Sequence, residues 1–167
     1  MSEGLTSSTA PASTVAPVLV ELLEVVTVGL PFCAFKLLFG SVLLSTTASV
    51  LGWLFIVLGA ADVVVNAVNA TGLLLVRRRW LQACTLSLLA QLARGRSRFA
   101  FTWQELGTSV DVLLSMAVVA LMIGLGFIAR LSPPLLLCWN VAVIANVLGA
   151  GVARFGHSLH EHLLHRR

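Results

Sequence analysis

Four long apolar stretches dominate the sequence and most constrain its fold. They lie at about residues 18–44, 48–76, 106–129 and 135–153. A helix that crosses the hydrocarbon core of a bilayer needs about 20 mainly apolar residues, and each stretch has that length or nearly so. Only 11% of the residues are charged, whereas soluble domains carry about 25%. So few charges cannot cover a water-facing surface. We therefore predict an all-α integral membrane protein and not a soluble all-α domain.

The lengths of the connections predict how the four helices pair. Residues 45–47 join the first two stretches and residues 130–134 join the last two. Connections this short join antiparallel neighbours. The middle connection, residues 77–105, is much longer. We therefore expect residues 17–154 to form a four-helix bundle made of two antiparallel transmembrane hairpins.

Basic residues predict the orientation of the bundle. The middle connection carries six arginines, which are Arg77, Arg78, Arg79, Arg94, Arg96 and Arg98. Connections rich in Arg and Lys stay in the cytoplasm. We therefore expect this connection and both termini to be cytoplasmic, and the short turns to face outward. Arg130, in the second short turn, opposes this orientation.

The middle connection also contains an apolar segment, residues 80–93, which is too short to span a bilayer. Its apolar residues can share one helical side, and arginines flank it. This pattern favours an interfacial amphipathic helix on an anionic inner leaflet. The alternative is a cytoplasmic extension of the second and third helices that packs on itself.

Polar residues interrupt the second apolar stretch at helical spacing. Asp62, Asn66 and Asn69 fall on one face of a helix. An Asp near the bilayer centre costs about 2.5–3.5 kcal/mol on insertion scales. This intramembrane polar stripe is therefore predicted to face protein, water or a bound solute.

Lys36 in the first stretch is the expected partner of this stripe. If the first hairpin folds about its short turn, Lys36 comes within reach of Asp62. Two interpretations of the pair stay open. It locks the hairpin together, or it forms a protonatable or substrate-facing group.

Other polar residues near the membrane are given secondary roles. Glu24 is expected to be solvated at the inner end of the first helix; alternatively, it lines the mouth of a pathway that continues from Asn69. Asp111 is expected to be an acid in the first turn of the third helix, favoured by the helix dipole, with a proton-relay role as the alternative. Pro31 should kink the first helix and free a backbone carbonyl.

The fourth stretch contains a face of small residues. Ala145, Gly149 and Ala153 follow a spacing that lets helix backbones approach closely, and Asn146 can hydrogen-bond across such a contact. We expect this face to pack within the chain or to form the seam of a homodimer.

The two ends of the chain differ from the apolar middle. Residues 1–16 are expected to be a disordered tail, and residues 155–167 form a basic, His-rich tail. His157, Glu161 and His165 can share one helical side, which makes them weak candidates for metal ligands. An amphipathic tail that contacts lipid headgroups explains the same residues, and we predict no metal.

The sequence carries no P-loop, GxSxG or HExxH motif and no paired CxxC. We therefore predict no enzymatic activity and no cofactor. We expect a small multi-pass protein of a bacterial inner membrane, because Arg greatly outnumbers Lys and Ala, Val and Leu are abundant. Its expected role is a structural or accessory subunit, with lipid and a second copy or another membrane protein as partners and no nucleic acid. The alternative is an oligomeric ion or proton-coupled transporter or channel that uses the polar stripe.

Overall fold

A computed structural model describes the backbone of residues 15–81, 84–93 and 100–164, and side-chain surroundings for residues 18–81, 84–90, 92 and 105–152. In chain order, the regular elements are α1 (Val15–Glu24), the π-helical turn η1 (Val25–Gly29), α2 (Leu30–Leu44), α3 (Ser49–Val76), α4 (Thr85–Ala93), α5 (Ala100–Gly124), the 3-10 turn η2 (Phe127–Arg130) and α6 (Pro133–Leu164).

Four of these helical segments are long and apolar enough to cross a membrane. They are Val18–Leu44, Ser49–Val76, Glu105–Gly124 and Pro133–Val152. Large apolar side chains remain exposed along α3, α5 and α6, as expected for helices solvated by lipid. The predicted all-α fold with four membrane-spanning helices is confirmed, and the chain has the architecture of a small multi-pass membrane protein.

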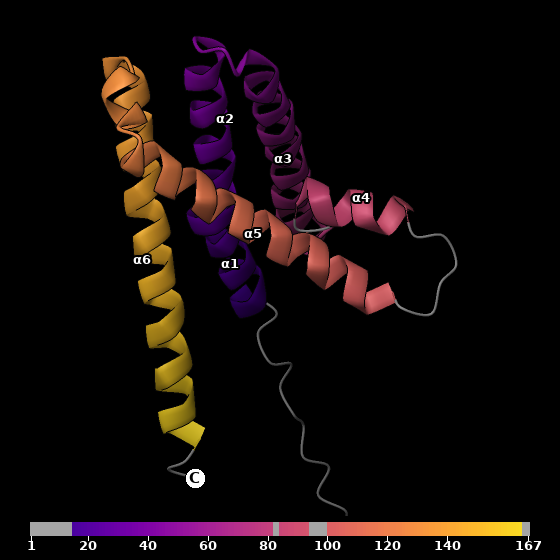
Figure 1. The fold of residues 1–167 in the computed structure, drawn as a ribbon. Helices are drawn as coiled ribbons and strands as arrows, with labels where there is room; N and C mark the ends of the chain where they lie inside the picture. Colours follow the sequence, from indigo (N-terminus) through magenta and orange to yellow (C-terminus); the bar gives the residue numbers. More distant parts are fainter. Residues whose placement is uncertain (1–14, 82–83, 94–99, 165–167) are drawn as a thin grey trace, which may run out of the picture.

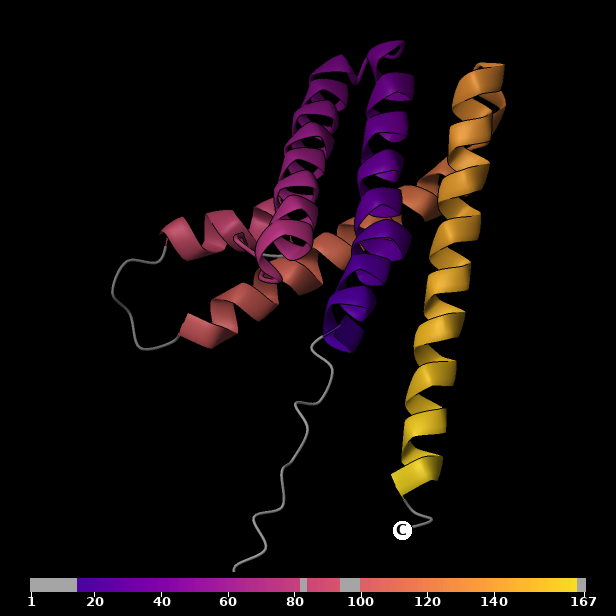
Figure 2. The same ribbon diagram turned by 180° about the vertical axis from the view of Figure 1, so that it is seen from behind.

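The first spanning helix is central to the bundle. Its parts α1, η1 and α2 follow one another as a single rod, with α3 on one side and α6 on the other (Figure 1). A short turn joins α2 to α3, which run antiparallel. Seen from both sides, α5 crosses this group obliquely (Figures 1 and 2). From their common turn α5 and α6 diverge, and both contact α2.

The third spanning helix is shorter than the sequence predicted. The apolar stretch was expected to be helical to residue 129, whereas α5 ends at Gly124. Gly126 has a φ of 65°, in the left-handed region that glycine adopts without a steric penalty. The helix therefore stops here, although the apolar sequence continues through η2.

The turn-side half of the bundle has an apolar core. Phe35 and Phe39 of α2 lie at its centre. The Phe35 ring is 5.0 Å from that of Trp139 in α6, and the Phe39 ring is 4.9 Å from that of Phe55 in α3, measured between centroids. Met122 of α5 completes this core. Three neighbouring helices are thereby held against α2.

The short helix α4 projects outward from the end of α3 and packs beside α5 (Figure 2). It covers residues 85–93 of the apolar segment that was predicted to be an interfacial helix. Gly107 of α5 lies against the backbone of Ser87, which lets the two helices approach closely. The placement of α4 on a membrane leaflet remains a prediction.

The beginning of α1 and the end of α6 lie at the same end of the bundle (Figure 1). Both termini of the described chain therefore belong to one side, as the predicted topology requires. Which side of a membrane this is stays a prediction.

Candidate functional site

The polar stripe of α3 faces the interior of the protein. Asp62 and Asn69 are 2% exposed and Asn66 is 5% exposed. Since each step of three or four residues returns to the same helical face, the three side chains line one buried surface. The expectation that the stripe is shielded from lipid agrees with this geometry.

Lys36 joins three spanning helices at the level of this stripe. Its Nζ lies 2.6 Å from Asp62 Oδ2 on α3 and 2.5 Å from Asp111 Oδ1 on α5. Lys36 itself, on α2, is fully buried. We call Lys36, Asp62 and Asp111 the triad. The sequence predicted the pair with Asp62 but not the bridge to α5.

The prediction for Asp111 is wrong in its placement. Asp111 was expected in the first turn of its helix, but α5 begins at Ala100. Asp111 lies well inside the helix, is buried, and pairs with Lys36. The sequence signal for this burial is that Thr108 and Ser115 share the helical face of Asp111, and Ser115 is fully buried in the structure.

After α3 the chain turns back along the polar stripe. Arg77 ends α3 in the left-handed conformation with a φ of 55°. We call residues 77–81 and 84–85 the returning segment. Within it, the Leu81 N–H donates to Asn69 Oδ1 over 2.8 Å, and the Thr85 N–H donates to Asp62 Oδ1 over 2.7 Å. The stripe therefore binds backbone donors that no side-chain pattern could reveal.

Close approach between α3 and the returning segment depends on Gly72. A Cβ at this position would lie 2.6 Å from the Arg78 carbonyl oxygen and 3.2 Å from the Trp80 ring. The Arg78 N–H in turn donates to the Gly72 carbonyl over 3.3 Å. Any larger residue at this position would push the returning segment away from the stripe.

Asn66 links the stripe to the first spanning helix. Its Nδ2 donates to the Asp62 carbonyl over 2.9 Å and lies 3.5 Å from Cys33 Sγ on α2. Gly29 of η1 lies directly against the Asn66 side chain, in space that a Cβ would fill. The stripe thus contacts α2, η1 and the returning segment.

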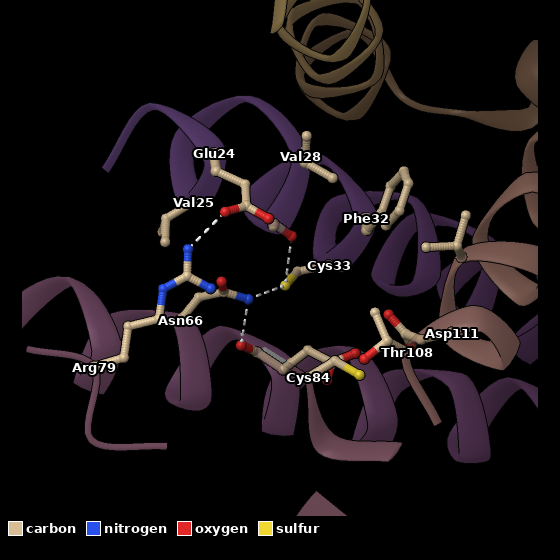
Figure 3. Close-up of a pocket in the computed structure, with 13 residues that line it drawn as sticks. Glu24, Val25, Val28, Phe32, Cys33, Asn66, Arg79, Cys84, Thr108 and Asp111 are labelled. Carbon is tan, nitrogen blue, oxygen red and sulfur yellow. Dashed lines mark hydrogen bonds and ion pairs between the residues drawn. The ribbon is translucent and has the colours of Figure 1, made fainter. Parts of the chain in front are cut away.

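A cavity of about 130 Å³ lies between these elements (Figure 3). Its lining residues are Glu24, Val25, Val28, Gly29, Phe32, Cys33, Asp62, Asn66, Arg79, Cys84, Thr108, Asp111 and Val112. The volume is large enough for several water molecules, and the polar groups can hold them. Asn69 is not among the lining residues.

Arg79 and Glu24 form the mouth of the cavity, and Glu21, which does not line the cavity, also pairs with Arg79. Arg79 Nη2 lies 2.6 Å from Glu24 Oε2, and Nε lies 3.0 Å from Glu21 Oε2. Partial burial lowers the pKa of Arg79, but its contacts with Glu24 and Glu21 outweigh this effect and raise the pKa above its usual value. Glu24 is exposed, as expected, and it also lines the cavity. Because Asn69 does not line the cavity, a pathway that continues from Asn69 to Glu24 stays a prediction.

The cavity meets the apolar core at its inner end. Phe32 belongs both to the cavity lining and to the core. Cys84 sits where the returning segment enters the cavity, and burial raises the pKa of its thiol. Phe32 therefore closes the cavity toward the apolar core, and the exposed Glu24 marks its open side.

The small-residue face of α6 packs inside the chain. A Cβ at Gly149 would collide with the Thr27 side chain of η1. Asn146 Nδ2 donates to the Thr27 carbonyl over 3.3 Å. Pro31 has no N–H to donate to this carbonyl four residues earlier, and Asn146 donates to it from α6. Ala145 is half-buried, and the side chain of Ala153 lies outside the described residues.

The candidate metal ligands of the tail cannot be placed together. The side chains of His157 and Glu161, on α6, and the whole of His165 lie outside the described residues. In the part of the chain that is described, no three His, Cys, Asp or Glu side chains form a metal-binding group.

Comparison with known proteins gives no family for this chain. No protein-family model matches it, and no curated protein or solved structure shows a significant match.

Proposed function

We propose that this protein is a non-catalytic structural or accessory subunit of a membrane assembly. The observation that carries this proposal is the occupation of the polar stripe by the chain itself. Asp62 accepts from Lys36 and from the Thr85 N–H, and Asn69 accepts from the Leu81 N–H. Together with the Lys36–Asp111 pair, these groups hold α2, α3, α5 and the returning segment in one arrangement.

The physical chemistry of the bilayer explains why such groups stabilise a fold. Non-helical backbone at membrane depth is tolerated where protein groups satisfy its polar atoms. The stripe supplies acceptors for two such backbone donors. Breaking a buried ion pair by removing one partner costs about 3–5 kcal/mol, so the triad strongly disfavours separation of the three helices.

The alternative function is transport, and the cavity is the observation that favours it. Carboxyl groups at both of its ends, those of Glu24 and Asp111, could guide an ion or a proton. A transport cycle would also have to open the apolar core, where Phe35 packs on Trp139. This requirement makes the structural role the better-supported proposal.

Substitution of Asp62 distinguishes the two functions. In a structural role, Asp62→Asn lowers the thermal stability of the purified protein, because Asn places its amide group against one of two donors. Glu105→Gln makes the same chemical change on an exposed side chain of α5 and should have no effect. Loss of ion or proton flux in reconstituted vesicles, with stability unchanged, would establish transport instead.

We further propose that the protein resides in a bacterial inner membrane with both termini in the cytoplasm. Clustered arginines after α3 support this orientation. A partner subunit would contact the exposed apolar faces of the helices, because the Gly149 face is already used against η1. Reporter fusions at the two termini test the orientation, and cross-linking in native membranes tests for the partner.

A further inference from the structure

The two carboxylates of the triad differ in their surroundings. Each oxygen of Asp62 faces a donor, since Oδ1 receives the Thr85 N–H and Oδ2 receives Lys36 Nζ. Asp111 Oδ1 also receives Lys36 Nζ. No donor from the described residues contacts Asp111 Oδ2, and the Asp111 side chain, only 7% exposed, lines the cavity.

Formal charge shows that the triad lacks one positive charge. One ammonium group faces two carboxylates, so the fully ionised triad carries a net charge of −1 in a buried site. A buried charge without compensation is costly, and a protein neutralises it most simply with a proton. When two carboxylates share one site, their repulsion favours the binding of a proton to one of them.

We propose that Asp111 is a proton-binding site, reached by water through the cavity. The proton adds to Oδ2, where it forms an O–H bond that points into the cavity, while Oδ1 still accepts from Lys36. Bulk water supplies this proton through the mouth at Glu24 and Arg79, and no electrons are transferred. Both oxygens of Asp62 already accept from an N–H donor, so Asp111 Oδ2 is the carboxyl oxygen of the triad that has room for a proton.

The other titratable and charged groups around Asp111 are defined by the same cavity. Those that share its lining or its ion pairs are Lys36 and Cys33 of α2, Asp62 of α3, Arg79 and Cys84 of the returning segment, and Glu24 of α1. Lys36 and Asp62 offset each other in charge. Arg79 is engaged by Glu21 and Glu24 at the mouth. Asp111 can therefore gain or lose a proton without breaking the Lys36–Asp62 pair or the pairs of Arg79.

Protonation of Asp111 affects how tightly α5 packs on α2. Asp111 is the residue that ties α5 to Lys36. Release of its proton adds a second buried negative charge beside Asp62, which weakens the packing of α5 on α2. The folded state therefore binds a proton that the unfolded state releases, and this contribution to stability is lost as the pH rises.

Infrared spectroscopy of the full chain in lipid vesicles tests this assignment. The wild type should show the carbonyl band of a protonated carboxylic acid at neutral pH, and the band should shift after exchange into D₂O. Asp111→Asn should abolish the band, whereas Glu24→Gln should retain it. Absence of the band from the wild type, its persistence in Asp111→Asn or its loss in Glu24→Gln would overturn the proposal.

Stability gives a second, independent readout. An amide mimics a protonated carboxyl, so Asp111→Asn should shift the melting temperature by less than about 2 °C, whereas Asp62→Asn should lower it by roughly 10 °C. Melting of the wild type should shift downward as the pH rises, and Asp111→Asn should lack that part of the shift. Equal losses in both variants, or an unchanged pH dependence in Asp111→Asn, would contradict the assignment.

Discussion

The two halves of the bundle are stabilised by different interactions. Toward the turns, aromatic and aliphatic side chains from four helices pack around Phe35 and Phe39. Toward the termini, the triad, Asn66, Asn69 and the returning segment form hydrogen bonds and ion pairs around a cavity. Close packing of apolar side chains stabilises the half toward the turns, and ion pairs and hydrogen bonds stabilise the half toward the termini.

This difference shows how a membrane protein obtains a unique fold in an apolar solvent. Lipid chains are as apolar as the core, so packing of Phe39 gains little from leaving lipid and depends on close contact. Polar groups behave differently, because lipid offers them no partner. The polar half therefore determines which helices meet, and the apolar half fills the remaining space.

Removal of the central ammonium group should have the largest effect. Lys36→Met leaves two buried carboxylates facing each other, and we expect a loss of about 3–5 kcal/mol in the free energy of unfolding. Steric trapping or denaturant titration in detergent micelles measures this loss. Val57→Ala on the exposed face of α3 is the control. If Lys36→Met is as stable as the wild type, the triad does not stabilise the half of the bundle toward the termini.

A cavity in the aromatic core should have a smaller effect. Phe39→Ala removes contacts with the rings of Phe55 and Phe127. In soluble proteins this change costs about 3–5 kcal/mol. We expect a loss of about 1–3 kcal/mol in the free energy of unfolding here, because a phenyl ring is nearly as stable in lipid as in the core. Trp53→Ala, on an exposed face, is the matched control. A loss larger than that of Lys36→Met would show that the apolar half contributes more to stability than the polar half.

The bond between α6 and the π-helical turn should contribute less. Asn146→Ala removes the donor to the Thr27 carbonyl, and hydrogen bonds between membrane helices average about 0.6 kcal/mol. Asn140→Ala changes an exposed Asn of the same helix and should leave the unfolding free energy unchanged. Equal effects of the two substitutions would indicate that Asn146 has no special role in fixing α6.

The ion pairs at the cavity mouth should contribute least. Arg79→Gln removes contacts with Glu21 and Glu24, both partly exposed. Such pairs are worth about 0.2–1 kcal/mol and are screened by salt. The loss should shrink between low and high ionic strength, with the exposed Arg78→Gln as control. A salt-independent loss would instead place Arg79 in the buried polar network.

Part of the site could be predicted from the chain because helical spacing is regular. Asp62, Asn66 and Asn69 share a face in any helix, and the short turn brings Lys36 to a similar depth. The role of Asp111 could not be predicted, because it depends on the oblique crossing of α5. The same holds for the N–H groups of Leu81 and Thr85, since every residue except proline carries such a donor.

The sequence by itself determined that the chain has four membrane-spanning helices and that its polar stripe faces inward. The reason is that lipid accepts apolar helices and rejects unpaired polar groups wherever they occur. Only the tertiary structure decided which groups satisfy the stripe. Those groups come from other helices and from the returning segment, and their positions follow from how helices cross and where the chain reverses. Hydropathy carries no information about either.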